Sequence, residues 1–483
     1  MGIIRKQGIK NSIITYIGIG IGFVSLIILQ PLFLTTEELG LTRILFSTSY
    51  LISSFIPLGM ANAITKYFPQ FRNEAKNNHG FLGIVLTGLA IGATIVSIIF
   101  VLIKPTIYQQ YHKESELFTN YLNWILPFSF ILALNSTFNT YSASLYKTVF
   151  PSFLNDILIR IVSILLYATY YIKLINIDTL VTLFISIYGA QLLCLAFYIF
   201  KHKAFNLRID IPFFKENNPT ELYKFCFIFS LAPVASYGIK FMDGIVMGKY
   251  LPLSMVGIYS VMAFIPTFIE APLTALEKIA NPKISDALVR KDEFDLQDIY
   301  FKSCRFMMFI GGILVLLIFT NSSYLISFMK PEYMKGINVI YIISIGALFN
   351  LYTGTNGPII FNSSNYLFGT LLLVSIMILT VFFNELFIPI WGLEGAAAAT
   401  ATASLLFNLG KFLFIRYKFN LQPYDFKNIL IIIFTIISLC ILYILPEASN
   451  IYFSAIYKSS IVLGVYLGLN YFSKTVLIKE FIK

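Results

Sequence analysis

The chain contains a long series of apolar stretches, each about 20 residues or more, which is the length of helix that crosses roughly 30 Å of hydrocarbon. Fourteen such stretches follow one another, separated by short polar connections. They do not alternate apolar and polar residues with a period of two, and they are about twice as long as the strand of a membrane barrel. The sequence therefore predicts an all-α polytopic membrane protein with fourteen transmembrane helices. The predicted spans are residues 11–34, 41–64, 80–103, 120–144, 150–172, 179–200, 223–247, 254–277, 300–320, 337–358, 365–389, 393–415, 428–446 and 451–473.

Composition and loop lengths indicate a transporter rather than an enzyme. Charged residues make up only 12% of the chain, against about 25% in soluble domains, and the apolar excess runs along its whole length. The longest connections, residues 201–222 and 278–299, are too short to hold a catalytic domain. The three histidines lie in polar connections, and the four cysteines are widely spaced. We therefore expect no metal site and no cofactor.

Basic residues predict the orientation of the chain in the membrane. Lys and Arg gather in alternate connections, for example in residues 201–208, 278–291, 411–418 and 474–483, and before the first span. Because short cytoplasmic loops collect Lys and Arg, this pattern places both termini in the cytoplasm. The net charge of +11 is thereby explained without any nucleic-acid partner.

The chain also repeats itself with a shift of about 216 residues. Leu39-Gly40-Leu41 recurs as Val256-Gly257-Ile258, Ile177-Asp178 recurs as Leu393-Glu394, and Pro57 matches Pro272. Two pseudo-equivalent six-helix bundles of the same orientation favour one cavity between them and transport by alternating access. The predicted domains are an N-terminal bundle (1–204), a cytoplasmic linker (205–222), a C-terminal bundle (223–419) and two additional helices (420–483).

Several short motifs resemble the Wzx-like polysaccharide flippases of the multidrug/oligosaccharidyl-lipid/polysaccharide superfamily. The motifs are Leu39-Gly40, Leu58-Gly59, Tyr67-Phe68-Pro69, Phe241-Met242-Asp243-Gly244, Met247-Gly248-Lys249-Tyr250, Val256-Gly257-Ile258-Tyr259-Ser260 and Asn281-Pro282-Lys283-Ile284-Ser285.

This resemblance implies an activity that the residue pattern alone does not show. A flippase of this kind moves an undecaprenyl-pyrophosphate-linked oligosaccharide across the bacterial cytoplasmic membrane during O-antigen or capsule biosynthesis. Its partners would be membrane lipids, a coupling H⁺ or Na⁺, and the polysaccharide polymerase machinery.

Ionisable residues inside predicted spans are the candidate functional residues, because a charge in hydrocarbon is costly. Arg160 lies about 15 Å into its span, near the midplane, and its guanidinium suits the oxygens of a pyrophosphate. The alternative is an internal ion pair with Asp156, four residues earlier, which would otherwise act in ion coupling or gating.

Lys240 and Asp243 are one helical turn apart. They form either a structural pair or a substrate-binding cation and an ion-coupling carboxylate. Glu270 lies between Pro266 and Pro272. There it would serve in ion coupling or in gating of transport, or it would accept a hydrogen bond from another helix. Arg43 contacts substrate or extends to the outer interface.

Two other functions are compatible with parts of this pattern. The first is a cation-coupled multidrug or metabolite antiporter of the related MATE family, although residues 11–34 contain no acidic residue of the kind that proton-coupled members often carry. The second is a membrane-embedded polysaccharide polymerase or ligase, which would need an outer catalytic loop.

The orientation can be tested with single cysteines and a membrane-impermeant thiol reagent. Cysteines at outer positions should react from outside, and cysteines at inner positions should not. Reaction of position 394 from the cytoplasmic side would contradict the arrangement of fourteen spans. The outer substitutions are Glu37→Cys, Asp178→Cys and Glu394→Cys, and the inner ones are Glu74→Cys, Asp210→Cys and Leu288→Cys.

Overall fold

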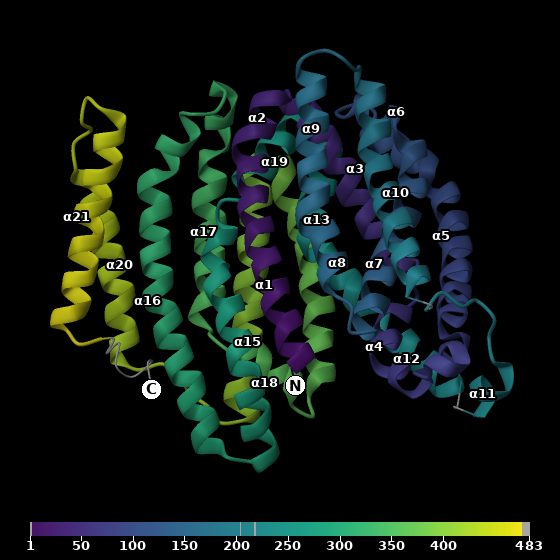
Figure 1. Cartoon of the computed structure of the whole chain (residues 1–483). Coiled ribbons are helices and arrows are strands. Elements are labelled where there is room, and N and C mark those ends of the chain that lie inside the picture. Colours follow the sequence, from purple (N-terminus) through teal and green to yellow (C-terminus); the bar gives the residue numbers. More distant parts are fainter. Residues whose placement is uncertain (1, 203, 217–218, 476–483) are drawn as a thin grey trace. The chain divides into compact units, whose positions relative to one another are not determined.

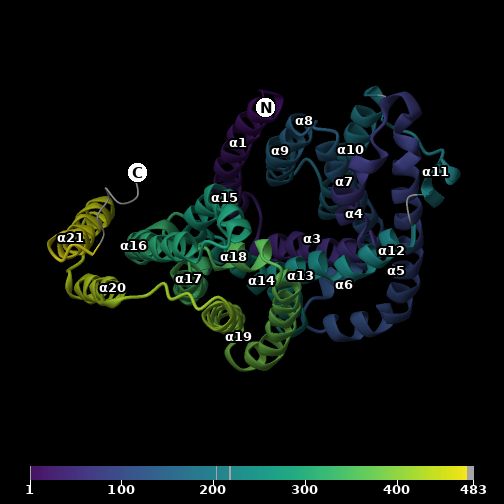
Figure 2. The same ribbon diagram turned by 90° about the horizontal axis from the view of Figure 1, so that it is seen from below.

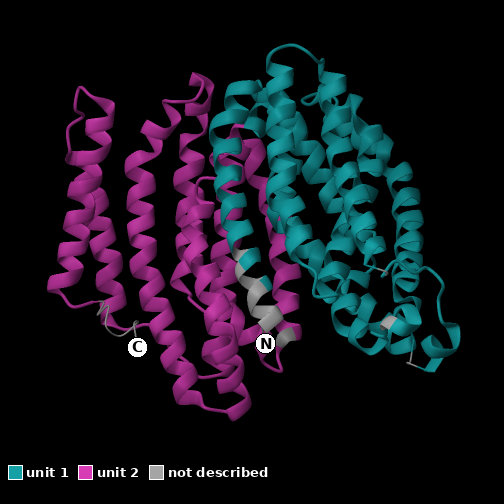
Figure 3. Ribbon diagram, in the orientation of Figure 1, with its two compact units in different colours: residues 1–257 teal, residues 258–483 magenta. Residues whose placement is uncertain are grey.

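A computed structural model describes residues 2–202, 204–216 and 219–475, and this part of the chain is helical with no strand. The predicted all-α polytopic fold is therefore confirmed. Lys203 and residues 476–483, which belong to two of the basic clusters, lie outside the described residues. The chain divides into two compact units, residues 1–257 and 258–483 (Figures 1 and 3).

Unit 1 consists of helices that end at short turns, and one last helix continues into unit 2. Two of its segments, η1 and η4, are π-helical turns, while η2 and η3 are 3₁₀ turns. The elements are α1 (Gly2–Phe23), η1 (Val24–Leu29), α2 (Gln30–Phe33), α3 (Thr36–Phe55), α4 (Met60–Phe71), η2 (Glu74–Gly80), α5 (Phe81–Tyr111), α6 (Glu116–Asn120), η3 (Leu122–Trp124), α7 (Ile125–Ser144), α8 (Val149–Phe153), η4 (Leu154–Leu158), α9 (Ile159–Tyr171), α10 (Ile177–Lys201), α11 (Ile211–Glu216), α12 (Pro219–Phe229), α13 (Leu231–Tyr250) and α14 (Leu253–Met262).

Unit 2 holds the remaining helices, among them the longest helical segment of the described chain. They are α15 (Thr267–Arg290), α16 (Glu293–Ile326), η5 (Pro331–Gly336), α17 (Ile337–Tyr352), α18 (Asn356–Asn362), α19 (Tyr366–Lys418), α20 (Phe426–Ile444) and α21 (Ile451–Phe472).

In the described part of the chain, ten helices are long and apolar enough to cross a membrane. The number rises to twelve when the bent pairs α3–α4 and α14–α15 each count as one span. The predicted number of fourteen is therefore not confirmed. The difference arises at α7, which carries too many polar residues to count, and at α19, which counts as one helix.

The segment α19 is nevertheless a helical hairpin. Its 53 residues would extend about 80 Å as one straight helix, far more than the hydrocarbon thickness. Instead, Gly392 adopts φ +57°, which is a left-handed conformation that favours glycine. The rings of Phe368 and Phe414 stack with centroids 3.8 Å apart although 46 residues separate them, so the two halves run back along each other.

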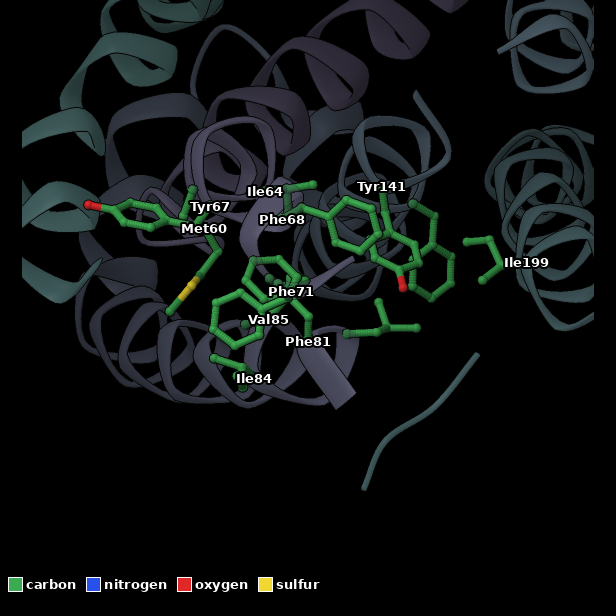
Figure 4. Close-up of a cluster of buried hydrophobic side chains, with 14 of the residues drawn as sticks. Met60, Ile64, Tyr67, Phe68, Phe71, Phe81, Ile84, Val85, Tyr141 and Ile199 are labelled. Carbon is green, nitrogen blue, oxygen red and sulfur yellow. The ribbon is translucent and has the colours of Figure 1, made fainter. Parts of the chain in front are cut away.

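The core of unit 1 is formed by aromatic and aliphatic side chains of α4, α5, α7 and α10. Phe68 contacts the rings of Phe81 and Tyr141 at centroid distances of 5.7 and 5.2 Å. Figure 4 shows these side chains directed toward one another together with Phe71 and Ile199. This packing fixes the positions of α7 and α10, which form part of the cavity described below.

The linker after α10 contacts the turn η2 through a hydrogen bond between His79 and Asp210. His79 Nδ1 lies 2.7 Å from Asp210 Oδ2, and the imidazole stacks on Phe213 at a centroid distance of 3.6 Å. The hydrogen bond with His79 and that from the backbone N–H of Phe213 lower the pKa of the Asp210 carboxyl. The contact is therefore present at neutral pH and weakens as the pH falls through this lowered pKa.

Two glycines of the repeated motif meet where α3 crosses the first residues of α14. A Cβ added to Gly40 would lie 1.9 Å from Leu253 O, and one added to Gly257 would lie 2.0 Å from Thr36 O. Each oxygen belongs to the residue four positions before the opposite glycine, so the contact is reciprocal. Such reciprocity is expected of two helices related by approximate twofold symmetry. The domain boundaries drawn from the repeat stay a prediction, and in the structure α12 and α13 belong to unit 1.

Gly40→Ala and Gly257→Ala should each lower the thermal midpoint of the detergent-solubilised protein. The added methyl group meets backbone that no rotamer change can move, and overpacking of this kind typically costs about 1–3 kcal/mol. Gly464→Ala in α21 is the matched control, because an added Cβ there has nothing within 4 Å. Midpoints equal to that of the control, measured by circular dichroism, would contradict the close crossing.

Candidate functional site

A cavity of about 540 Å³ lies within unit 1. It is lined by residues of α3, α7, α8, η4, α9, α10 and α13, and Figure 2 shows α7, α9 and α10 side by side with α1 next to α8. Three of the six predicted site residues, Arg160, Asp156 and Lys240, line this cavity. The structure thus brings together residues from two predicted bundles that are far apart in the sequence.

One face of α1 packs against α8, η4 and α9 through polar and small residues. Asn11 Nδ2 donates to Thr148 Oγ1 at 2.5 Å, and Thr148 Oγ1 also donates to Gln7 Oε1 at 3.2 Å. The residues of this face recur every three or four positions, which places them on one side of the helix. They are Gln7, Asn11, Thr15, Gly18 and Gly22.

Arg160 in α9 is positioned by the two glycines of that face. Its Nη1 donates a hydrogen bond to Gly18 O. A Cβ added to Gly22 would lie only 1.8 Å from the same nitrogen, so the guanidinium occupies the space that a larger side chain would fill. The backbone of α1 therefore holds the cation while leaving it without a carboxylate partner in the described part of the chain.

Asp156 does not form the predicted alternative, an ion pair with Arg160. Its Oδ2 accepts a hydrogen bond from Thr15 Oγ1 at 3.2 Å instead. The reason is local: residues 154–158 form a π-helical turn, which changes the angular register that would place residues four apart on one face.

Lys240 also lines the cavity, and it comes from α13, a helix far from α9 in the sequence. Its Nζ lies 5.3 Å from the centroid of the Phe241 ring, and it enters no ion pair in the part of the chain that the structure describes. The lining therefore combines two cations with one carboxylate, and its formal charge is positive.

An aromatic wall, defined here as Phe46, Tyr50, Tyr188, Tyr237 and Phe241, covers one side of the cavity. The ring of Tyr50 lies 4.7 Å from that of Tyr237 and 5.4 Å from that of Phe241, and Phe46 lies 5.8 Å from Tyr188. These residues come from α3, α10 and α13. The sequence indicates Tyr237 as a tyrosine that could stack on a sugar, but it does not single out the other four residues, because aromatic residues are abundant in every predicted span.

A polar face of α7 forms part of the remaining lining. Asn135, Ser136, Asn139 and Thr140 all border the cavity. Asn135 Nδ2 donates to Tyr188 O at 2.9 Å, whereas its buried Oδ1 has no hydrogen-bond partner in the described chain. The signal for this face was present in the sequence as amide and hydroxyl residues on neighbouring turns of an otherwise apolar span.

The other predicted residues lie outside this cavity. Arg43 Nη2 donates to Gln30 Oε1 of α2, and Asp243 is buried in α13. In unit 2, Glu270 Oε1 accepts a hydrogen bond from Asn350 Nδ2 at 2.8 Å, the interhelical contact that was the simpler of its two interpretations.

Unit 2 contains a buried cation that the sequence pattern does not predict. Lys411 of α19 is only 6% exposed, and its Nζ lies 4.4 Å from the Phe407 centroid. It interacts electrostatically with Glu277 and Glu270 of α15. In the sequence, Lys411 precedes Arg416 in a basic segment that is typical of a cytoplasmic connection, and Glu277 stands at the end of a predicted span.

The geometry of the unit 1 cavity suits an anionic, partly planar ligand. A guanidinium and an ammonium supply charge-assisted hydrogen bonds to phosphate oxygens, and amides and hydroxyls can bind the polar edges of a sugar. Aromatic rings supply flat apolar contact. Among the described residues, no group of three or more His, Cys, Asp or Glu could hold a metal ion.

Residues 32–331 match the protein family described as "Polysaccharide biosynthesis protein". This match confirms the resemblance found in the sequence at the level of the family. An uncharacterized membrane protein of Methanocaldococcus jannaschii is 20% identical over 459 residues, which cover 89% of this chain and 88% of the relative.

Solved structures show the same fold. The lipid II flippase MurJ in an inward closed conformation has a TM-score of 0.76 at 15% identity, with 96% of this chain and 99% of that chain covered. A multidrug resistance MATE family transporter of the MOP superfamily, inward-facing, has a TM-score of 0.63 at 14% identity (83% and 94% covered). A MOP superfamily transporter from Pyrococcus furiosus has a TM-score of 0.57 at 14% identity (86% and 96% covered).

Gly22→Ala should weaken the binding of inorganic pyrophosphate by about tenfold, because the new methyl group displaces the Arg160 guanidinium without removing its charge. Arg160→Lys should also bind more weakly, since a point charge replaces a fork. Gly20→Ala, in the same helix but with nothing within 4 Å of the added Cβ, is the matched control. Isothermal titration calorimetry measures all three, and wild-type affinity in Gly22→Ala would contradict this placement of Arg160.

Proposed function

The chain belongs to the polysaccharide biosynthesis protein family, and we propose that it is a flippase for a lipid-linked oligosaccharide. The substrate would be a polyprenyl pyrophosphate, such as undecaprenyl pyrophosphate, that carries a sugar repeat unit. The protein would turn it from the cytoplasmic to the outer leaflet of the bacterial cytoplasmic membrane during O-antigen or capsule biosynthesis. Polysaccharide polymerase machinery would then use the product.

The observation that carries this proposal is the positively charged cavity of unit 1. Arg160 and Lys240 both line it, and neither has a carboxylate partner in the described chain. Unpaired cations at membrane depth are costly unless an anion binds them, and a pyrophosphate supplies that anion. The aromatic wall and the polar face of α7 would receive the sugars.

The same charge argues against an antiporter for cationic drugs. A cationic ligand would meet two cations and only one carboxylate, Asp156, which already accepts a hydrogen bond from Thr15. The family and the transporter folds it resembles also favour transport over polymerase or ligase chemistry.

In the proposed cycle, the cavity opens alternately to the two sides of the membrane. Substrate binding favours one of these two states and substrate release favours the other, so that the pyrophosphate crosses the membrane while it is bound in the cavity. Ion coupling would reside at Asp243 or at Glu270. Both are carboxylates within spanning helices, and the Glu270 side chain neighbours the buried Lys411. Binding of H⁺ or Na⁺ there would neutralise a carboxylate and bias the facing equilibrium.

Translocation of a fluorescent lipid-linked oligosaccharide in reconstituted vesicles tests the proposal. Wild-type protein should move the label to the opposite leaflet, and Arg160→Ala should abolish transport while the protein stays folded. Arg160→Lys should recover part of the rate. Full transport in Arg160→Ala combined with Asp156→Ala would show that Arg160 serves only to balance Asp156, and would contradict its role in binding.

The same vesicles, with and without a proton or sodium gradient, address coupling. At least one of Asp243→Asn and Glu270→Gln should lose the stimulation by the gradient and keep substrate binding. Stimulated transport that persists in both variants would place coupling elsewhere.

A further inference from the structure

A second, apolar groove runs beside the polar cavity of unit 1. Its volume is about 440 Å³, and it lies between the faces of α9 and α10. Along α10 its lining extends from Leu183 to Cys194, which is roughly 17 Å of helix. On the facing side it includes Leu158, Val162 and Leu165, of which Leu165 is 59% exposed.

The groove offers little to a polar ligand. Its two hydroxyl groups are occupied by their own helices: Thr169 Oγ1 donates to Leu166 O at 2.8 Å, and Ser186 Oγ donates to Thr182 O at 2.7 Å. The rest of the lining is aliphatic except for Gln191 and Cys194. The surface therefore suits a hydrocarbon chain.

The groove and the polar cavity share part of their walls. Ile159 and Gln191 line both. Gln191 Nε2 donates to Asn155 Oδ1 at 3.1 Å, so this amide–amide hydrogen bond and Ile159 lie where the two spaces adjoin. Asn155 belongs to the π-helical turn η4, and π turns are frequent at functional sites because they displace a helix locally.

We infer that this groove binds the isoprenoid chain of the substrate while its pyrophosphate is in the cavity. The inference rests on the proposed function, and it assigns the tail a defined path between α9 and α10. A phospholipid acyl chain is the less suitable occupant, because its head group stays at the membrane surface and gains nothing from a connection to the cavity. An amphiphile with its head at Arg160 needs an apolar path at this depth.

The chain provides its own probe for the groove. Cys194 lines it and is exposed, and Cys440 of α20 is an exposed free cysteine in unit 2, which makes it the internal control. Protein in phospholipid vesicles is treated with N-ethylmaleimide, and the adduct at each cysteine is measured by mass spectrometry. The ligands are undecaprenyl-pyrophosphate-linked oligosaccharide and the same pyrophosphoryl sugar without a long tail.

The tail-bearing ligand should reduce the labelling rate of Cys194 by about tenfold at saturation, whereas the tail-less ligand should leave it unchanged and Cys440 should react alike in all samples. Equal protection by both ligands would mean that the effect spreads from the cavity, and would overturn the inference. Binding of the tail-bearing ligand without any protection of Cys194 would assign the groove to membrane lipid and overturn it too, while the proposed function would stand. Failure of that ligand to bind at all would overturn both.

A pair of variants on α10 provides a second measurement. Ala190→Phe fills the groove and should weaken the tail-bearing ligand by about tenfold relative to the tail-less one, the effect of losing roughly 60 Å² of apolar contact. Leu193→Phe, at a 72% exposed position that does not line the groove, should change neither affinity. Equal losses in both variants, or none in Ala190→Phe, would contradict the tail site.

Discussion

Inside hydrocarbon, every backbone N–H and C=O must find a partner within the protein, and this constraint governs where the helices of this chain can be irregular. The break between α3 and α4 contains Leu58 and Gly59, both with positive φ, and Gly59 lies directly against the backbone of Cys226 in α12. The π turn at residues 154–158 is covered on one side by α1 and borders the cavity on the other. At both of these breaks, another helix or the cavity lining surrounds the irregular backbone.

The fold class could be predicted because hydropathy is a local property. Each apolar stretch reports its own tendency to cross the membrane, without knowledge of its neighbours. The number of spans was harder to predict for the same reason, because hydropathy takes no account of what a helix packs against. The predicted span 120–144 contains α7, whose polar face is explained only by the cavity it borders. The two predicted spans at 365–389 and 393–415 both lie in α19, where Gly392, with its positive φ, makes the turn between them.

The candidate site was predictable only in part. Arg160, Asp156 and Lys240 were found by one rule, the cost of burying a charge in a span, and the structure places all three on one cavity. Sequence could not show that Gly18 and Gly22 hold Arg160, or that Asp156 accepts a hydrogen bond from Thr15, because these contacts depend on α1 lying beside α9. The burial of Lys411 could not be predicted, because the basic residues that follow it in the sequence are typical of a cytoplasmic segment.

The space at Gly22 has an evolutionary consequence. Because a Cβ at this position would overlap the Arg160 guanidinium, a substitution of Gly22 forces that guanidinium to move, which couples the two positions. A lineage that replaces the glycine must therefore move, shorten or neutralise the cation. The two positions should therefore covary among relatives, and the residue found at 22 should indicate whether a given relative holds a guanidinium against this face of α1.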